Sequence, residues 1–176
     1  MRSLAETVLE ELRTGLAAAK SQADSAVAQL DDDDLFRVLD AHSNSIAVIM
    51  RHCAGNMRSR WREFLTTDGE KVDRGRDAEF ELPPERTRIA VVAEWEDGWR
   101  MAFMAIEQLR PEDLQRTITL NGEPLSVVAA VERATRHYSS HAGQIVLLAK
   151  HFRGADWKTL TVPRGKSREF FDATRK

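Results

Sequence analysis

The sequence predicts an all-α protein, a four-helix bundle formed by a single domain over residues 1–176. Apolar residues recur at helical spacing in four long segments, and residues that favour helix ends lie close to the ends of these segments. No repeated strand pattern and no internal repeat competes with this interpretation. A bundle is the natural way to bury four amphipathic stripes at once. The expected helices cover approximately residues 3–30, 44–65, 84–109 and 126–153.

Capping residues locate the first two helices. Ser3 and Glu6 have the spacing of a capping box, in which each side chain satisfies a free backbone N–H group at the helix start. Four aspartates at residues 31–34 follow the first helix. They lack the alternating ligands and the glycine of a calcium loop, so we interpret them as a turn that caps the next helical turn. Residues 42–45 supply capping side chains for the second helix.

A long loop is expected between the second and third helices, because residues 66–84 mix both charges and lack apolar periodicity. Two interpretations stay open: a lid or rim of a site, and a solvated connection. Pro83 and Pro84 suit the first turn of the third helix. Trp95 and Trp99 continue the apolar stripe of that helix, so core packing is favoured over a stacking platform for a ligand.

The last part of the chain combines a small turn, a helix and a tail. Residues 117–122 end in Asn-Gly and predict a minimal hairpin. Ser126 begins the fourth helix and Gly154 ends it. The remaining residues, 157–176, predict an extended C-terminal tail that packs across the bundle or onto a partner subunit. Its candidate anchors are aromatic: Trp157, Phe170 and Phe171.

The composition excludes several classes of protein. The 26 basic and 28 acidic residues give a formal charge of −2, which argues against a nucleic-acid-binding surface or a membrane-surface patch. The single cysteine, Cys53, excludes an intrachain disulfide and fits a reducing compartment. No apolar run approaches the roughly 20 residues needed to span a bilayer, and the first residues carry acids where a signal peptide would be apolar. We expect a soluble, cytoplasmic protein that binds neither nucleic acid nor membrane.

The histidines carry the functional signal. His137 and His141 lie four residues apart in the fourth helix, so both rings project from one face of it. His52 in the second helix can also reach the interior, although a hydrogen-bonded core residue is the simpler interpretation of His52 taken alone. Three imidazoles in an apolar interior leave several ring nitrogens in need of partners unless a metal binds them. We therefore predict a metal site, with a metal-free core cluster as the alternative.

Neutral imidazole suits several divalent transition metals. We expect zinc or nickel first, with iron or manganese as alternatives. Three residues are candidates for hydrogen bonds to the rings or to a substrate: Asn56, Arg60 and Gln144. Arg60 could meet an anionic substrate or the carboxylate of a thiol, although a surface ion pair is the more common role of such an arginine.

Two features bear on catalysis. Cys53 points about 100° away from His52 on the helix, so a core role is favoured over that of a ligand or nucleophile. Glu107 and Glu132 are the helical acids closest to the histidines by pattern, and neither is clearly on the inner face. The lack of an obvious general base argues mildly against activation of water.

Several motifs carry a family resemblance. They include the histidine pattern and short polar stretches along most of the chain: Ser43-Asn44-Ser45-Ile46, His52-x-x-Gly55-Asn56, Arg60-Trp61, Thr67-Asp68-Gly69-Glu70-Lys71, Arg76-Asp77-x-Glu79-Phe80, His141-Ala142-Gly143-Gln144-Ile145 and Pro163-Arg164-Gly165. With these motifs the chain resembles the DinB-like (YfiT-like) superfamily of metal-binding four-helix bundles, and more closely an uncharacterised, domain-of-unknown-function branch of it. The resemblance implies that His52, His137 and His141 are the metal ligands. Members of the superfamily often dimerise, so the resemblance also implies a homodimer as a state that this sequence allows.

Relatives in that superfamily include thiol-dependent transferases, isomerases and proteins proposed to be metal-dependent hydrolases. We therefore expect a metal-dependent enzyme that acts on a small molecule, either a transferase that activates a low-molecular-weight thiol or a hydrolase that activates water. The alternative is a non-catalytic metal-binding or stress-related module. A thiol transferase needs less proton transfer by the protein, so the missing general base affects it less.

Overall fold

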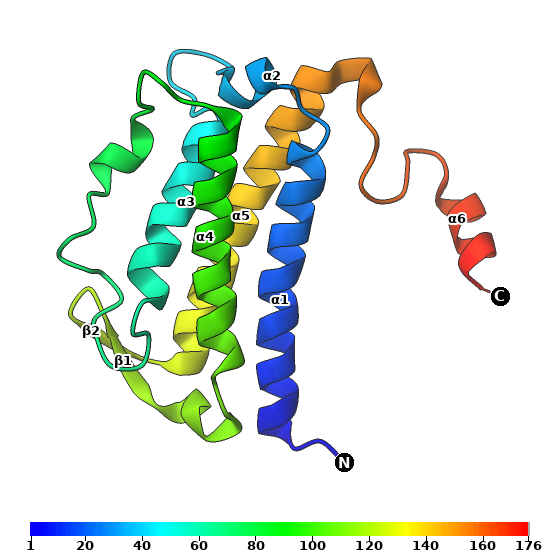
Figure 1. Ribbon diagram of the computed structural model, residues 1–176. Coiled ribbons are helices and arrows are strands. Elements are labelled where there is room, and N and C mark those ends of the chain that lie inside the picture. The colour runs from blue at the N-terminus through cyan, green and yellow to red at the C-terminus, as the bar shows by residue number, and fades with distance from the viewer. Residues whose placement is uncertain (176) are drawn as a thin grey trace.

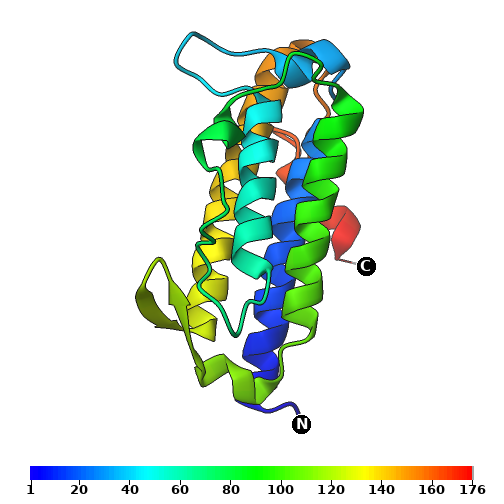
Figure 2. The ribbon, with the colours of Figure 1, turned by 60° about the vertical axis from the view of Figure 1, so that its left-hand side comes forward.

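The computed structural model describes residues 1–175 and is mostly helical, as predicted. Within that range it contains six α-helices and one two-stranded hairpin. Four long helices lie side by side (Figures 1 and 2): α1 (Leu4–Val27), α3 (Ile46–Trp61), α4 (Arg88–Glu107) and α5 (Val127–Arg153). Two helices are short: α2 (Asp32–Phe36) and α6 (Ser167–Thr174). No helix among the described residues combines the length and the apolar character needed to cross a membrane.

Side-chain caps begin the helices where the sequence predicted them. Ser3 accepts a hydrogen bond from the backbone N–H of Glu6 at 3.2 Å, and the Glu6 carboxylate accepts one from the backbone N–H of Ser3 at 2.7 Å. Ser45 and Ser126 accept bonds of the same kind at the starts of α3 and α5. Asp31 caps α2, which confirms the turn predicted for the aspartates. The Ser45 and Ser126 caps fix the starts of α3 and α5, the two helices that carry the histidines.

The helices pack closely around an apolar core. The most extensive contacts join α3 to α4 and α1 to α5. At Gly98 the backbones of α4 and α3 nearly touch, because a Cβ atom there would lie 2.9 Å from the Cα atom of Ala54. Trp95 and Trp99 are 3% and 1% exposed, which confirms their predicted core role. The core therefore holds α3 at a fixed distance from its neighbours.

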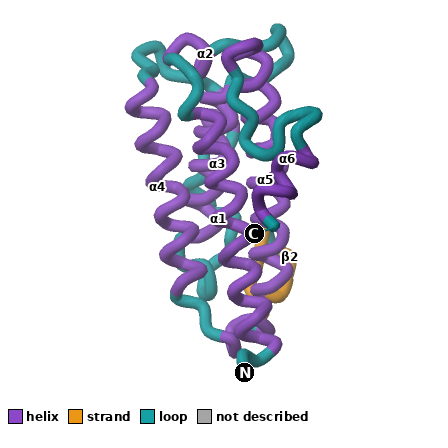
Figure 3. The backbone as a smooth tube through the Cα atoms, turned by 90° about the vertical axis from the view of Figure 1, so that its right-hand side faces the viewer, coloured by secondary structure: helices purple, strands orange, loops and turns teal. Residues whose placement is uncertain are grey.

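α3 and α5 run in opposite directions, since α3 begins at the end of the molecule near α2 and α5 begins at the hairpin end (Figure 1). The hairpin consists of β1 (Thr117–Leu120) and β2 (Glu123–Ser126), paired antiparallel. Its turn, Asn121-Gly122, has positive φ values of 52° and 78°, which confirms the predicted tight turn. Figure 3 shows the hairpin at the same end of the molecule as the N-terminus.

Two predicted boundaries of the middle helices were wrong. α3 ends at Trp61 rather than at residue 65. α4 begins at Arg88, and Pro83 and Pro84 lie in the preceding loop. Thr87 caps α4, because its hydroxyl accepts the backbone N–H of Ala90 at 3.2 Å. A side-chain cap satisfies a free N–H group, whereas proline only omits one of these groups, so the threonine sets the boundary.

The prediction of a wholly extended tail was also wrong. Residues 167–174 form α6, which stands apart from the four long helices (Figure 1). Phe170 and Phe171 are 45% and 55% exposed, so they do not anchor the tail to the core. Trp157 does pack partly against the core, and the Gln29 side chain accepts the backbone N–H of Lys158 at 2.8 Å. Only the first part of the tail is therefore attached.

Candidate metal centre

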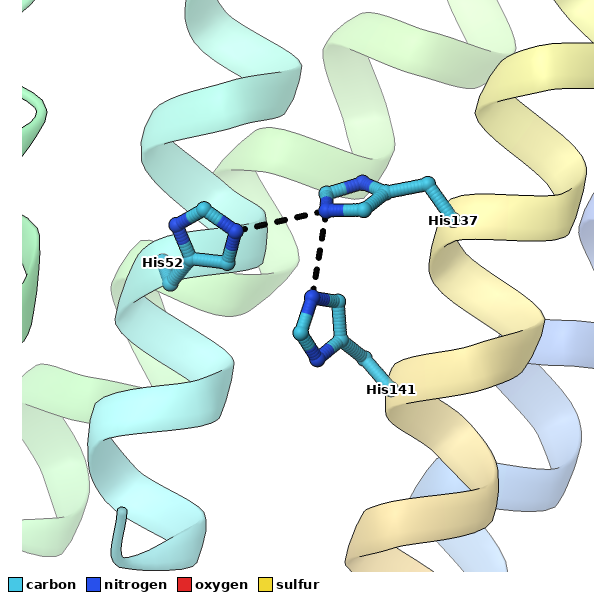
Figure 4. A group of neighbouring side chains, drawn as sticks. All are labelled: His52, His137 and His141. Atoms are coloured by element: carbon cyan, nitrogen blue, oxygen red, sulfur yellow. Dashed lines mark hydrogen bonds between the residues drawn. The ribbon is translucent and has the colours of Figure 1, made fainter. Parts of the chain in front are cut away.

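The three histidine rings predicted to form a site meet between α3 and α5 (Figure 4). His52 projects from α3, and His137 and His141 project from successive turns of α5. The Nε2 atom of His137 lies 3.3 Å from Nε2 of His52 and 3.1 Å from Nε2 of His141. One ligand atom from each ring lies within 4.8 Å of the other two. The group could therefore hold a metal ion.

Hydrogen bonds behind two of the rings fix which nitrogen faces the centre. The Nδ1 atom of His52 lies 2.9 Å from Oε2 of Glu79, and Nδ1 of His141 lies 2.8 Å from Oε1 of Gln144. Carboxylate and amide oxygens only accept, so each Nδ1 atom carries the ring proton and each Nε2 atom presents a lone pair. His137 can give one Nε2 proton to only one of these two neighbours. The rings cannot satisfy one another, and a shared cation would satisfy all three.

Two of the three separations between ring nitrogens fit a bound metal. Metal–nitrogen bonds of about 2.0 to 2.1 Å place two ligands about 3.3 Å apart at a tetrahedral angle and about 3.0 Å apart on one face of an octahedron. The separations from Nε2 of His137 to the other two Nε2 atoms, 3.1 and 3.3 Å, lie within this range, and the ligand atoms of His52 and His141 lie within 4.8 Å of each other. The donor set of three imidazoles also matches sites that keep further coordination positions open.

Burial keeps the α5 histidines neutral. Desolvation, together with the neighbouring rings, lowers the pKa of His137 from 6.5 to about 3. Desolvation also lowers the pKa of His141, against the opposing effect of the hydrogen bond that the ring donates to Gln144. A neutral imidazole is the form that binds metals, so protons compete little for these two ligands near neutral pH.

Glu79 is the functional residue that the sequence analysis missed. It lies in a 3-10 helix, Asp77–Phe80, within the loop between α3 and α4, and it is only 8% exposed. Arg74 donates to its two oxygens at 2.8 Å each. Burial alone would raise the pKa of Glu79, but the hydrogen bonds from Arg74 and His52 outweigh it and lower the pKa. The carboxylate therefore stays ionised behind His52, where it orients the ring and favours the metal-binding tautomer.

The backbone of α3 makes room for this carboxylate at Gly55. A Cβ atom at Gly55 would lie 2.3 Å from Oε1 of Glu79, which is too close for any side chain. Phe80, the next residue in the loop, stacks on the His52 ring with the centroids 4.8 Å apart. Glycine at this position of α3 therefore lets the loop reach the back of the His52 ring.

The two helical acids nearest to the histidines by pattern are both off the inner face of the bundle. Glu132 is exposed and lies 3.6 Å from Arg136, and Glu107 is exposed at the end of α4. Glu79 was named only within a motif of the family resemblance and was given no role at the site, because its loop has no apolar periodicity that would show which side chains turn inward. Gly55, three residues after His52 inside a helix, was the available signal of a close approach.

The remaining candidates take different positions. The amide oxygen of Gln144 accepts the hydrogen bond from Nδ1 of His141. Asn56 accepts the hydroxyl proton of Tyr138 at 3.0 Å and bonds no histidine within residues 1–175. Cys53 is fully buried, and burial raises the pKa of its thiol, so it is a core residue. Arg60 is 9% exposed rather than a surface residue, and its Nη2 atom lies 3.9 Å from Oε2 of Glu70.

A pocket of about 460 Å³ adjoins the histidines. Its wall includes His52 and His137, together with Asn56 and Arg60. A small molecule in this pocket would therefore touch two of the three rings. This position makes the centre accessible to a ligand, unlike a closed structural site.

The loop at residues 66–84 borders this centre and is tied to the hairpin. The Asp68 carboxylate accepts the backbone N–H groups of Asn121 and Gly122 at 2.7 and 2.8 Å. The backbone N–H of Gly69 donates to the carbonyl of Thr119 at 2.9 Å. Ser59 on α3 donates its hydroxyl proton to the carbonyl of Gly69 at 3.1 Å. Of the two interpretations left open, the structure favours a rim of the site over a solvated connection.

Fold and centre together define a class: a mostly helical protein with a three-histidine group that could bind a metal. Comparison with protein families takes this further. The family model described as "Protein of unknown function (DUF1572)" matches residues 3–166, and the chain belongs to this family. The predicted link to an uncharacterised domain family is thereby confirmed. Comparison with curated proteins returns no match.

Proposed function

We propose that the protein is a metal-dependent enzyme built on a four-helix bundle of the DinB-like type. The four long helices, lying side by side, support the bundle. The histidines support the family type, since one comes from the second long helix and two from the last, which is the arrangement behind the resemblance. His52, His137 and His141 are the proposed ligands, with zinc or nickel as the first candidates for the metal.

One observation carries the proposal: three Nε2 atoms converge where a pocket reaches two of the rings. Metal sites with three protein ligands keep a position for a small molecule, whereas structural zinc sites are usually closed by a fourth protein ligand. A metal held here would supply a Lewis acid that lowers the pKa of a bound water or thiol. Glu79 and Gln144 would hold two of the ligand rings in the binding orientation.

The residues around the centre favour a thiol over water as the nucleophile. Glu79 lies behind His52 and is engaged by Arg74, so it does not face the pocket as a free base. Glu70 does line the pocket, but Arg74 donates to both of its oxygens at 3.1 Å. A thiol loses its proton more easily than water and needs no protein base. The proposed reaction is therefore transfer of an electrophilic group to a low-molecular-weight thiol.

In that reaction a carbon–sulfur bond forms as the leaving group departs with its electron pair, and the thiol proton passes to solvent. The test uses untagged protein loaded in turn with zinc, nickel, iron or manganese. Thiol consumption with an aryl chloride is followed in parallel with hydrolysis of a nitrophenyl ester. His137→Ala removes a ligand, and His151→Ala is the matched control, because His151 is an exposed histidine on the same helix.

Thiol transfer that is present in the parent protein and in His151→Ala, and absent from a folded His137→Ala variant, is the expected result. Ester hydrolysis without thiol transfer would replace the proposed reaction by hydrolysis. Metal binding without either activity would leave a non-catalytic metal-binding module. Circular dichroism of each variant separates loss of activity from loss of the fold.

A further inference from the structure

The pocket beside the histidines has a strongly positive wall. Four arginines line it, and they come from α3, from α5 and from the loop between α3 and α4: Arg60, Arg133, Arg74 and Arg76. Glu70 is the one acidic residue in the same wall. A pocket with this excess of positive charge attracts anions.

Two of these arginines already have partners. Arg74 donates to both oxygens of Glu79 and to both oxygens of Glu70. Arg76 is exposed, and its guanidinium lies over the Phe80 ring, 5.3 Å from the centroid. Arg60 and Arg133 therefore remain as the cations that could bind a ligand.

Arg60 is buried without a complete set of partners. The residue is 9% exposed, and its Nε atom has no hydrogen-bond partner among residues 1–175. The nearest carboxylate oxygen, Oε2 of Glu70, is 3.9 Å from Nη2 and is already bonded to Arg74. An arginine stays charged when buried, and a buried charge with poor pairing is costly. An anion in the pocket would supply the negative charge and the hydrogen-bond acceptors that Arg60 lacks within the protein.

Arg133 stands on the same side of the centre as Arg60. Arg60 follows His52 by eight residues on α3, and Arg133 precedes His137 by four residues on α5. Because the two helices run in opposite directions, both arginines lie toward the hairpin (Figure 1). Arg133 forms none of the ion pairs found within residues 1–175. Two guanidinium groups that share a pocket repel each other until an anion lies between them.

We infer that this pocket contains an oxyanion subsite, in which Arg60 and Arg133 bind a carboxylate or phosphate group of the substrate. Helix geometry places Arg133 about 6 Å, and Arg60 about 12 Å, along the helix axes from the ring-bearing turns. The substrate is therefore a small molecule with an oxyanion at one end and its reacting atom several ångströms away. This inference rests on the proposed function only in assigning the anion to a substrate. The subsite itself needs no metal.

The test is a chemical-shift titration of the ¹⁵N-labelled full chain at low ionic strength, after treatment with a chelator. Inorganic phosphate and succinate are the two probes. We expect saturable shifts at backbone amides around the pocket, including that of Asn121. Arg133→Gln and Arg60→Gln should each weaken binding by roughly tenfold or more, because each removes charge-assisted hydrogen bonds. Arg136→Gln is the matched control, since Arg136 is exposed on the same helix as Arg133 and lies outside the pocket wall.

Tighter binding of phosphate would identify a phosphate-bearing substrate, and tighter binding of succinate a carboxylate-bearing one. The inference is overturned if neither probe saturates, or if Arg133→Gln binds as well as the parent. Arg133 is exposed, so this variant keeps the test valid even where Arg60→Gln does not fold. His141 is outside the pocket wall, so anion binding should survive in His141→Ala. Anion binding by a protein that shows no turnover would retain the subsite and reject the proposed reaction.

Discussion

Replacing Glu79 by glutamine removes the negative charge behind His52 and keeps the shape of the side chain. The Glu79 carboxylate is 2.9 Å from Nδ1 of His52, and Glu79 as a residue is 8% exposed, so solvent screens this contact little. An amide oxygen can still accept the ring proton, but a neutral acceptor makes the ring a weaker donor to the metal than a carboxylate does. Glu79→Gln should therefore weaken metal binding without abolishing it.

The expected size follows from comparable contacts to ligating histidines. Removing such a partner typically lowers metal affinity by roughly 10- to 100-fold, which corresponds to about 1.4 to 2.7 kcal/mol. Arg74 loses its charged partner in the same variant and keeps Glu70. The metal-free protein should therefore also lose about 1 to 3 kcal/mol of stability.

The assay is competition of the protein with a chromogenic chelator for zinc, paired with urea denaturation of the metal-free protein. Glu132→Gln is the control, because Glu132 is exposed on α5 and, within residues 1–175, forms an ion pair with Arg136 alone. The control should bind zinc as tightly as the parent protein. The reasoning is refuted if Glu79→Gln also binds zinc as tightly as the parent protein. It is also refuted if Glu79→Gln binds zinc more tightly.

Three further outcomes are expected. Gly55→Ala should displace the Glu79 carboxylate and weaken zinc binding at least as much as Glu79→Gln, and unchanged affinity in the same competition would contradict the close approach. Asp68→Asn should cost about 1 kcal/mol and speed amide exchange in the hairpin turn, because a neutral side chain accepts the turn N–H groups less strongly; unchanged exchange would argue against the clamp. The metal-free protein should lose stability as the pH falls from 6.5 toward 3, because the native chain keeps His137 and His141 neutral while the unfolded chain binds protons; constant stability in urea over this range would contradict the lowered pKa values.

Local signals in the sequence were sufficient for most of the helices. Ser3, Ser45 and Ser126 cap helices as expected, since a cap depends on residues within one turn of it. The start of α4 was placed too early because Pro83 and Pro84 suit a first helical turn, whereas the cap is Thr87, which the sequence analysis did not consider. The tail was expected to be extended, yet it forms α6 over residues 167–174.

The candidate metal centre was likewise predictable only in part. Helical spacing and the inward faces of two helices brought His52, His137 and His141 together in the prediction, and the structure places their nitrogens close to one another. The contact of Glu79 with His52 depends on how a non-periodic loop folds back over α3. No local pattern encodes that path, and only the glycine at position 55 reflects it in the sequence.

The central claim is that three imidazoles bind one divalent metal. It is tested most directly by measuring the metal content of untagged protein after zinc loading and dialysis, together with X-ray absorption at the metal edge. The account predicts one zinc ion per chain with three imidazole nitrogens in its coordination sphere, and loss of that zinc in His52→Ala and His137→Ala. A parent protein that retains no zinc would contradict the account. So would His52→Ala and His137→Ala variants that retain as much zinc as the parent protein.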